Sequence, residues 1–457
     1  MYWWSNIAFP ESERVRVITP TEESFVCTYL ESRYYLDKCK STDFLGVDAT
    51  YPENINISRD FFYKIPENRH KWISAVHRDG YGLVQCSTQL MKGRKTFVWG
   101  QGQGGRNWNE WLSVEGSAYI EIQAGLAHTQ LEHIPMPANT TWKWCEAYFP
   151  ICSTGEKMHG DYKSAIDTVE DVIKSTVGNP DNLTFPCPRV LDSQIVCQGS
   201  DWGYLEEKLR GERISDDFEF PNTASCEVAL WDTLLDEKRF DTQGKSASPI
   251  SYVTDKRLLA ALRALEEQTW YSQLHIGVIE YAGGNIKAAE EAWNASMALS
   301  ANCWAIRNLA MLYKNEYHQT ARAVEAILRA YELNKTSRTI LIECAEILTA
   351  TGNDGRWLAI EETLATTEKN IARLRLLTAV ALINVGQLAR ATEIVNPSFM
   401  MSDIKEGELS VSHIWFRLYR EIYAQEQNIV GRELTDEEIA LADKKYPLPK
   451  KLDFRMH

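Results

Sequence analysis

The sequence predicts a multidomain β + α protein in which a β-sandwich region precedes an α-helical solenoid. Two observations lead to this fold class. Up to about residue 151, short β-branched and aromatic runs alternate with Gly, Pro, Asn or Asp, as in an antiparallel sandwich. From about residue 255 the apolar residues follow helical spacing, and small residues recur with a period of 34, as in a repeat array.

The composition disfavours two kinds of partner. The chain has 457 residues, of which 44% are hydrophobic and 25% charged, a globular composition long enough for two or three domains. A net charge of −14 without a basic cluster disfavours nucleic acid. Because no apolar run approaches the roughly 18 residues of a membrane span, we expect no membrane partner.

The termini and cysteines predict a cytoplasmic location. The first residues lack the basic segment and the cleavage site of a signal peptide. The ten cysteines are scattered without a CxxC pair, which is typical of free thiols in a reducing compartment. No His, Asp or Glu spacing resembles a metal site, so we expect neither a metal nor a cofactor.

The β region contains six candidate strands. They are residues 24–29, 73–76, 82–87, 96–99, 117–123 and 140–151. Residues 1–9 are also aromatic and apolar, which suits the middle of a buried strand better than a free terminus. We therefore expect the chain to begin inside a domain.

Residues 96–125 are the part richest in functional side chains. They contain Trp99, Trp108, Arg106 and a glycine-rich run at 100–105. Indole rings stack on sugar rings, and a guanidinium binds hydroxyl or carboxylate groups; core packing and a surface ion pair are the alternatives. The glycines match GxGxxG, but no βαβ unit surrounds them, so we expect a loop at the mouth of a sandwich rather than a dinucleotide site.

Glu121 is the candidate catalytic residue. The run from Tyr119 to Gln123 alternates with a period of two, so Tyr119, Glu121 and Gln123 share one face of a strand. A carboxylate on a buried face costs several kcal/mol unless it is paired or used, and a raised pKa would suit a general base. The alternative is that this face is solvated. His128 follows closely and could bind a hydroxyl.

The rest of the chain is predicted to be helical. Helices are expected at 161–175, 203–210 and 226–238, a strand-like piece at 189–197, and a capping box at 435–438. Gly284, Gly352 and Gly386 share one 34-residue grid, and His occupies the remaining slot at 318. Ala289, Ala323 and Ala391 share another, with Trp357 in the fourth position. This spacing is the signature of tetratricopeptide (TPR) repeats.

Three motifs together resemble one family. They are Trp-Gly-x-Gly-x-x-Gly-x-x-Trp at 99–108, Tyr-Ile-Glu-Ile-Gln-Ala-Gly at 119–125 and Trp-Lys-Trp-Cys-Glu-Ala-Tyr-Phe-Pro-Ile at 142–151. They resemble a bacterial domain of unknown function in the galactose mutarotase-like superfamily, found fused to TPR repeats. The resemblance implies a β-supersandwich about twice as long as the β region here, so we expect its N-terminal half to be missing.

The resemblance also implies a role for Glu121. In aldose epimerases of this superfamily a glutamate in a Leu-Glu-x-Gln setting is the general base, and Glu121 with Gln123 resembles that position. The partner acid is a histidine in an Asn-His pattern. The corresponding residues here, 3–6, contain no histidine.

The sequence predicts four parts of the chain and two alternative functions. The parts are 1–152, the C-terminal part of a mutarotase-like sandwich; 153–250, a mixed connector; 251–400, TPR-like repeats; and 401–457, C-terminal helices and a tail. The first function is carbohydrate binding or turnover (a hydrolase or epimerase), with Glu121 as catalytic residue. The residues expected to contact the sugar are Gln123, Arg106, Trp99, Trp108 and His128. The alternative is a non-enzymatic scaffold whose repeats bind a protein or peptide and whose sandwich is a sugar-sensing or structural module.

Overall fold

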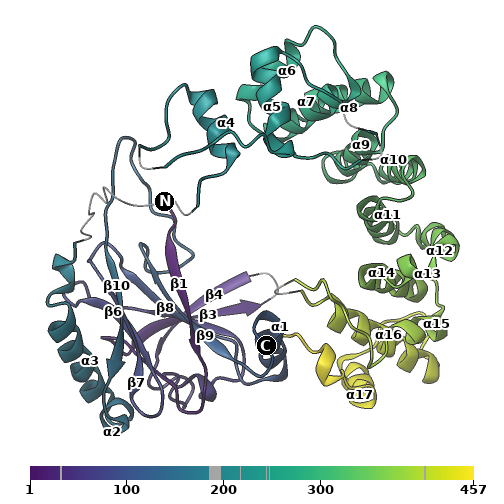
Figure 1. Cartoon of the computed structure of the whole chain (residues 1–457). Helices are drawn as coiled ribbons and strands as arrows, with labels where there is room; N and C mark the ends of the chain where they lie inside the picture. The colour runs from purple at the N-terminus through teal and green to yellow at the C-terminus, as the bar shows by residue number, and fades with distance from the viewer. Residues whose placement is uncertain are drawn as a thin grey trace. The chain divides into compact units, whose positions relative to one another are not determined.

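The computed structural model divides into two compact units. One comprises Met1–Arg189 with Ile404–His457, and the other comprises Val190–Asp403; their elements are labelled in Figure 1. The structure describes residues 1–30, 33–184, 197–216, 218–242, 244–245, 247–405 and 408–456. The strand-like piece expected at 189–197 lies almost entirely outside the described residues. The fold class is confirmed: antiparallel sheets are followed by paired helices.

The first unit contains two antiparallel sheets. The larger has the strand order β1-β9-β8-β5-β3-β4 and the smaller has the order β10-β7-β6-β2. The strands are β1 (Trp4–Pro10), β2 (Arg16–Ile18), β3 (Glu23–Leu30), β4 (Arg33–Lys40), β5 (Arg59–Tyr63), β6 (Lys71–Val76), β7 (Tyr81–Ser87), β8 (Gly93–Val98), β9 (Tyr119–Gly125) and β10 (Glu146–Cys152). All six expected runs overlap strands, although β10 begins only at Glu146.

Apolar side chains fill the space between the sheets. Val17, Phe61, Ile73, Val98 and Ile122 are all buried in one cluster there. The expected helix at 161–175 is confirmed as α3 (Tyr162–Thr176), which follows the short α2 (Gly155–His159). Its apolar face packs on the opposite side of the smaller sheet, so that sheet is covered on both faces.

The first strand differs from the expectation. Residues 1–9 were expected to lie in the middle of a buried strand, but within the described chain β1 pairs only with β9 and forms an edge of the larger sheet. Met1, Tyr2 and Trp3 are 42%, 48% and 46% exposed. The aromatic side chains therefore do not signal a buried strand. Trp4 explains part of the pattern, because its indole lies over Gly93 and Gly125, where a Cβ would collide with it.

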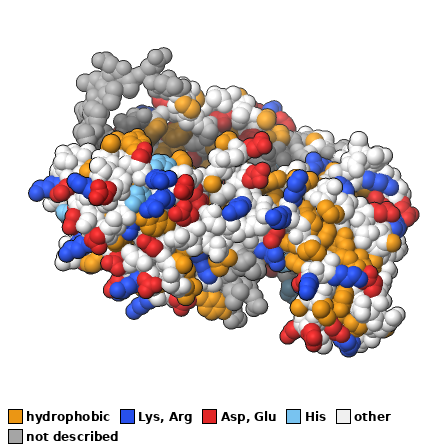
Figure 2. Space-filling model, turned by 90° about the horizontal axis from the view of Figure 1, so that it is seen from below, with side chains coloured by type: hydrophobic (Ala, Val, Ile, Leu, Met, Phe, Trp, Pro, Cys, Tyr) orange, Lys and Arg blue, Asp and Glu red, His pale blue; other side chains and the backbone are white. Residues whose placement is uncertain are grey.

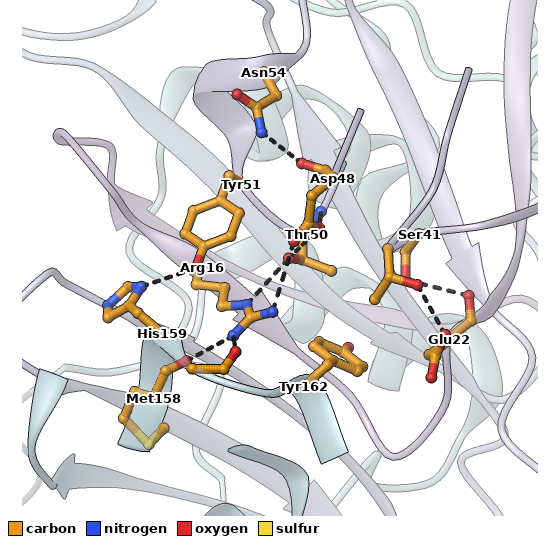
Figure 3. A network of polar contacts seen from close by, with 12 residues as sticks. Arg16, Glu22, Ser41, Asp48, Thr50, Tyr51, Asn54, Met158, His159 and Tyr162 are labelled. Atoms are coloured by element: carbon orange, nitrogen blue, oxygen red, sulfur yellow. Dashed lines mark hydrogen bonds and ion pairs between the residues drawn. The ribbon is translucent and has the colours of Figure 1, made fainter. Parts of the chain in front are cut away.

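Arg16 joins three segments of the first unit (Figure 3). Its guanidinium donates hydrogen bonds to Thr50 Oγ1 at 3.2 Å and to the carbonyl oxygens of Met158 and Gly160 at 3.0 and 2.9 Å. The rings of Tyr51 and Tyr162 lie 5.0 and 5.1 Å from its guanidinium carbon. Since Arg16 is 4% exposed, it is a structural cation that fixes α2 against β2.

The second unit consists largely of antiparallel helix pairs. After α4 (Asp201–Arg210), α5 (Cys226–Glu237) and α6 (Arg257–Arg263), the pairs are α7 (Trp270–Ala282) with α8 (Ile286–Leu299), α9 (Cys303–Asn315) with α10 (Thr320–Leu333), α11 (Arg338–Ala350) with α12 (Asp354–Thr363), and α14 (Ala372–Asn384) with α15 (Leu388–Ile394). The short α13 (Thr366–Lys369) precedes the last pair. First residues of successive pairs lie about 34 apart, as in TPR repeats.

The repeat grid has a physical basis. Gly284, Gly352 and Gly386 occupy the turns between paired helices with φ of +81°, +70° and +75°, a region that only glycine enters without cost. His318 stands in the same slot with φ +52°. Ala289, Ala323 and Ala391 are fully buried where paired helices touch. In the described chain every helix is too short or too polar to cross a bilayer.

Replacing His318 with glycine should stabilise the repeats. The left-handed backbone at this position is strained for histidine, and its side chain is exposed. We expect a gain in unfolding free energy of roughly 0.5–1 kcal/mol, measured by urea denaturation. Gly386→Ala makes the reverse change at the equivalent turn, where φ is +75°. This variant should lose about 1 kcal/mol of unfolding free energy. Equal effects of the two substitutions would contradict this account of the turn.

His275 should make the second unit acid-sensitive. It is fully buried among Trp231, Phe240 and Tyr271, and neither ring nitrogen has a hydrogen-bond partner among the residues that the structure describes. Burial lowers its pKa to about 3. As pH falls from about 6.5, His275 becomes protonated in the unfolded chain but stays neutral in the folded chain. The free energy of unfolding therefore drops by up to about 1.4 kcal/mol per pH unit.

His275→Leu should remove this pH dependence. The difference in unfolding free energy between variant and native chain should grow between about pH 6.5 and about pH 3. The measurement is urea unfolding at a series of pH values. Parallel pH profiles for the two proteins would contradict the assignment.

Candidate functional site

The larger sheet carries a polar patch on the face opposite its core. Strand register places Glu121 opposite Ala8 and Phe97, and places Gln123 opposite Asn6 and Lys95. Ile120 and Ile122 are buried in the core on the other face. The expected alternation along β9 is therefore confirmed. Phe97 is in turn opposite Asp60 on β5, which brings four strands into one patch.

Hydrogen bonds link the patch from a cation to a carboxylate. Lys95 Nζ lies 2.6 Å from Asp60 Oδ1 and donates to Gln130 Oε1 at 2.7 Å. Gln130 donates to Gln123 Oε1 at 2.6 Å, and Gln123 donates to Glu121 Oε2 at 2.7 Å. In each glutamine the amide N–H is thus the donor in the hydrogen bond on the side of Glu121. This fixes the orientation of both glutamine side chains. We call Asp60, Lys95, Gln130, Gln123, Glu121 and Asn6 the polar row.

Asn6 completes the environment of Glu121. Its Nδ2 donates to Glu121 Oε2 at 3.0 Å. Both hydrogen bonds that this carboxylate accepts therefore reach Oε2, and Oε1 has no partner among the described residues. Glu121 is half-buried, whereas Asn6 and Ala8 on the edge strand are exposed. The second oxygen can accept a proton or a hydrogen bond from a ligand that approaches over β1.

The opposite end of the polar row is buried. The side chains of Lys95 and Asp60 are 7% and 2% exposed. Burial raises the pKa of Asp60, Lys95 opposes this effect, and the nearby charge of Glu121 adds to it. Lys95 Nζ also lies 5.7 and 5.6 Å from the ring centroids of Phe62 and Phe97. This end is a paired, aromatic-lined support rather than an accessible binding group.

Both predicted tryptophans have partners within the protein. Trp99 is 1% exposed and lies edge-on to Phe97 and Tyr119. Trp108 is fully buried, and its Nε1 donates to the carbonyl oxygen of Phe454 at 2.9 Å. Neither ring offers a free face to a sugar in this structure.

Arg106 lies in a separate cavity. This open cavity of about 610 Å³ is lined by Arg106, Gln101, five glutamates and backbone near Ser117. Its lining does not include Glu121. Gln101 donates to Glu11 at 2.6 Å, and burial raises the pKa of Glu11 while Arg106 opposes the rise. The structure therefore groups Glu121 with Gln123 but not with Arg106.

His128 lies on the loop after β9. Its Nε2 is 3.7 Å from Glu67, and both side chains are substantially exposed at 40% and 68%. The hydrogen bonds of Glu121 come from Asn6 and Gln123, not from this histidine. Among the residues that can be described, no group of three His, Cys, Asp or Glu could hold a metal ion.

The glycine-rich run at 100–105 was expected to be a loop, but only residues 100–102 lie outside regular structure, and residues 103–105 form the first turn of a helix. α1 (Gln103–Leu112) begins after Gly102. It connects β8 to β9, which are antiparallel neighbours. A dinucleotide fingerprint requires parallel strands, so the rejection of that site is confirmed.

The face drawn in Figure 2 mixes acidic and basic side chains and offers no continuous basic area for a nucleic-acid backbone.

Sequence reasoning missed four members of the polar row. Asp60, Lys95 and Gln130 were not selected, and Asn6 was noted only as part of a pattern without histidine. Lys95 and Asp60 do carry a weak signal, because each is a charged residue within a strand that also contains aromatic residues, beside a second charge, Arg94 or Arg59. Such a position costs free energy unless it is paired. The pairing itself depends on strand order.

Comparisons with known proteins support the fold alone. No family model and no curated protein matches the chain. The structure is similar to the crystal structure of a TPR-domain containing protein from Parabacteroides distasonis, with a TM-score of 0.59 and 14% identity over 96% of this chain and 67% of that one. The TPR part of the expected resemblance is thereby confirmed. The mutarotase-like part stays a prediction.

The buried ion pair gives a stability prediction. Lys95→Met leaves Asp60 buried without its cation, and we expect a loss of about 3–5 kcal/mol in unfolding free energy. Adding Asp60→Leu should restore a large part of this loss, because the uncompensated charge is gone. Urea unfolding of the two single variants and the double variant measures the coupling. Additive losses would show that Lys95 and Asp60 act independently.

Proposed function

We propose that this protein binds a carbohydrate at the polar row of its larger sheet, with the helical repeats as scaffold. The observation that carries the proposal is the half-buried Glu121, whose Oε2 accepts two amide hydrogen bonds while Oε1 has no partner in the described part of the chain. A carboxylate oriented in this way accepts hydrogen bonds from hydroxyl groups. Sugars present several such groups on a small apolar frame.

The surroundings of Glu121 favour a neutral polyhydroxyl ligand. Asn6 and Gln123 supply amide groups, which donate and accept hydrogen bonds. Lys95 is already paired with Asp60, so its charge is compensated and the row has no spare cation for an acidic ligand. The likeness of the sequence around Glu121 to mutarotase-like proteins points to the same ligand class.

Binding is proposed in preference to epimerisation. An epimerase needs a general acid as well as a general base. The two groups that hydrogen bond to Glu121 are both amides, and an amide is too weak an acid to serve as a general acid at neutral pH. Glu121 is accordingly assigned as the principal hydroxyl ligand, with Gln123 and Asn6 as orienting groups.

The alternative is that the repeats bind a protein or peptide. Its support is the likeness to a TPR-domain protein. Arg307 on α9 argues against a site that clamps a charged peptide, because Glu343 already binds its guanidinium. Arg307 Nε donates to Glu343 Oε2 at 2.7 Å, and Nη2 makes a second contact with Oε1. A peptide carboxylate would have to displace Glu343. Carbohydrate binding therefore remains the favoured proposal.

A saccharide screen with a matched pair of variants tests the proposal. A sugar at 100 times its dissociation constant should stabilise the chain by about 2.7 kcal/mol in a thermal-shift assay. Glu121→Gln should weaken binding about 10- to 100-fold, the value of a hydrogen bond to a charged group. Glu23→Gln changes an exposed carboxylate on the same sheet and should bind like the native chain. Equal binding by the two variants would overturn the assignment.

A further inference from the structure

The C-terminal segment of the chain packs against helix α1. It follows α16 (Ser410–Glu426), α17 (Asp436–Lys445) and the 3-10 turn η3 (Lys450–Leu452). The expected capping box at Thr435 is present at the start of α17. Residues 404–456 belong to the same compact unit as α1. The contact therefore lies within one unit.

α1 recognises mainly the backbone of this segment. Asn107 Nδ2 donates to the carbonyl oxygens of Lys450 and Asp453, both at 2.7 Å. Trp108 Nε1 donates to the carbonyl oxygen of Phe454 at 2.9 Å. The N–H of Ser58, outside the helix, donates to the carbonyl oxygen of Met456 at 3.2 Å. Four carbonyl groups of one short segment are thus satisfied by the rest of the unit.

Gly104 makes room for the segment. A Cβ at this position would lie 1.7 Å from the carbonyl oxygen of Arg455 and 2.6 Å from its carbonyl carbon. Those atoms are backbone and cannot move aside as a flexible side chain can. Even alanine at 104 therefore excludes the observed path of the segment.

One aromatic side chain anchors the segment. Phe454 packs edge-on against Trp108 and Trp111, with ring centroids 5.0 and 6.4 Å apart. Arg455 and Asp453 pair with each other at 2.7 Å, so neither charge requires a partner on α1. This combination of backbone hydrogen bonds and one aromatic anchor is typical of sites that bind peptides.

We propose that α1 is a peptide-binding site for segment 450–456 of this chain, and that the site also binds the segment when it is supplied as a separate peptide. In the intact chain the link through α16 and α17 raises the effective concentration of the segment, so the site is occupied by its own tail. A second tail, from another copy or a cleaved chain, competes for the same groove.

The opposite side of α1 contacts other parts of the same unit. Asn109 Oδ1 accepts the N–H of Tyr119 at 3.0 Å, at the first residue of β9. Arg106 on the same helix lines the open cavity. One helix therefore contacts both the segment and the start of the strand that carries Glu121.

Digestion by a broad-specificity carboxypeptidase tests the proposal on the chain of residues 1–457. The bound tail should resist digestion, and Gly104→Ala should release Met456 and Arg455 about tenfold faster or more, because cleavage follows the population of the undocked state. Gly355→Ala is the matched control, since a Cβ there meets nothing within 4 Å. Equal digestion of the two variants would overturn the docking role of Gly104.

Competition by a synthetic peptide tests binding in trans. A peptide of residues 449–456 in excess should accelerate digestion of the native tail, and the same peptide carrying a fluorophore should show a rise in fluorescence anisotropy when it binds. The same peptide with Phe454 replaced by alanine should do neither, because it lacks the anchor. If the native peptide has no effect on either readout while Gly104→Ala frees the tail, the segment is only an intrachain contact and the proposal is wrong.

Discussion

The backbone of α1 at Gly104 approaches the carbonyl group of Arg455 too closely for any side chain, and much of the first unit depends on this contact. It sets the distance at which Trp108 and Asn107 reach the tail. On its other side the helix holds the N–H of Tyr119. The helix, the last residues of the chain and the first residue of β9 are therefore positioned together, although more than 330 residues separate the first from the second.

This dependence explains why sequence reasoning misread the glycine-rich run. A helix with two glycines and few strong helix formers is a poor candidate on intrinsic propensity. Its glycines are placed by tertiary contacts instead. Gly102 lies close to the carbonyl oxygen of Asn56, Gly104 to that of Arg455, and Gly105 to that of Trp99. A glycine pattern that resembles a phosphate-binding motif is thus explained by three places where the backbone lies close to a carbonyl oxygen. These contacts depend on the folded structure and could not be predicted from the sequence.

Local periodicity predicted more than long-range pairing did. The repeats were found because their glycines and alanines recur at fixed spacing, and each helix pair is formed from adjacent residues. β9 was found because its side chains alternate. The three-residue β2, the five-residue β5 and the eight-residue β4 were missed. Gln123 was predicted to share a face with Glu121. Asn6, Lys95 and Asp60 could not be predicted, since they are linked to Glu121, directly or through Gln130 and Gln123, by a strand order that no single segment contains.

The distribution of charge along the polar row indicates how the site can select its ligand. Lys95 and Asp60 compensate each other at the buried end, so the remaining charge is that of Glu121, at the end nearer the exposed edge strand. An anionic ligand would meet this carboxylate without a free cation in the row to offset the repulsion. A neutral ligand with hydroxyl groups meets an acceptor that two amides already orient. Under the proposed function, the row would discriminate by charge first and by hydrogen-bond geometry second, and the buried ion pair would contribute to specificity without touching the ligand.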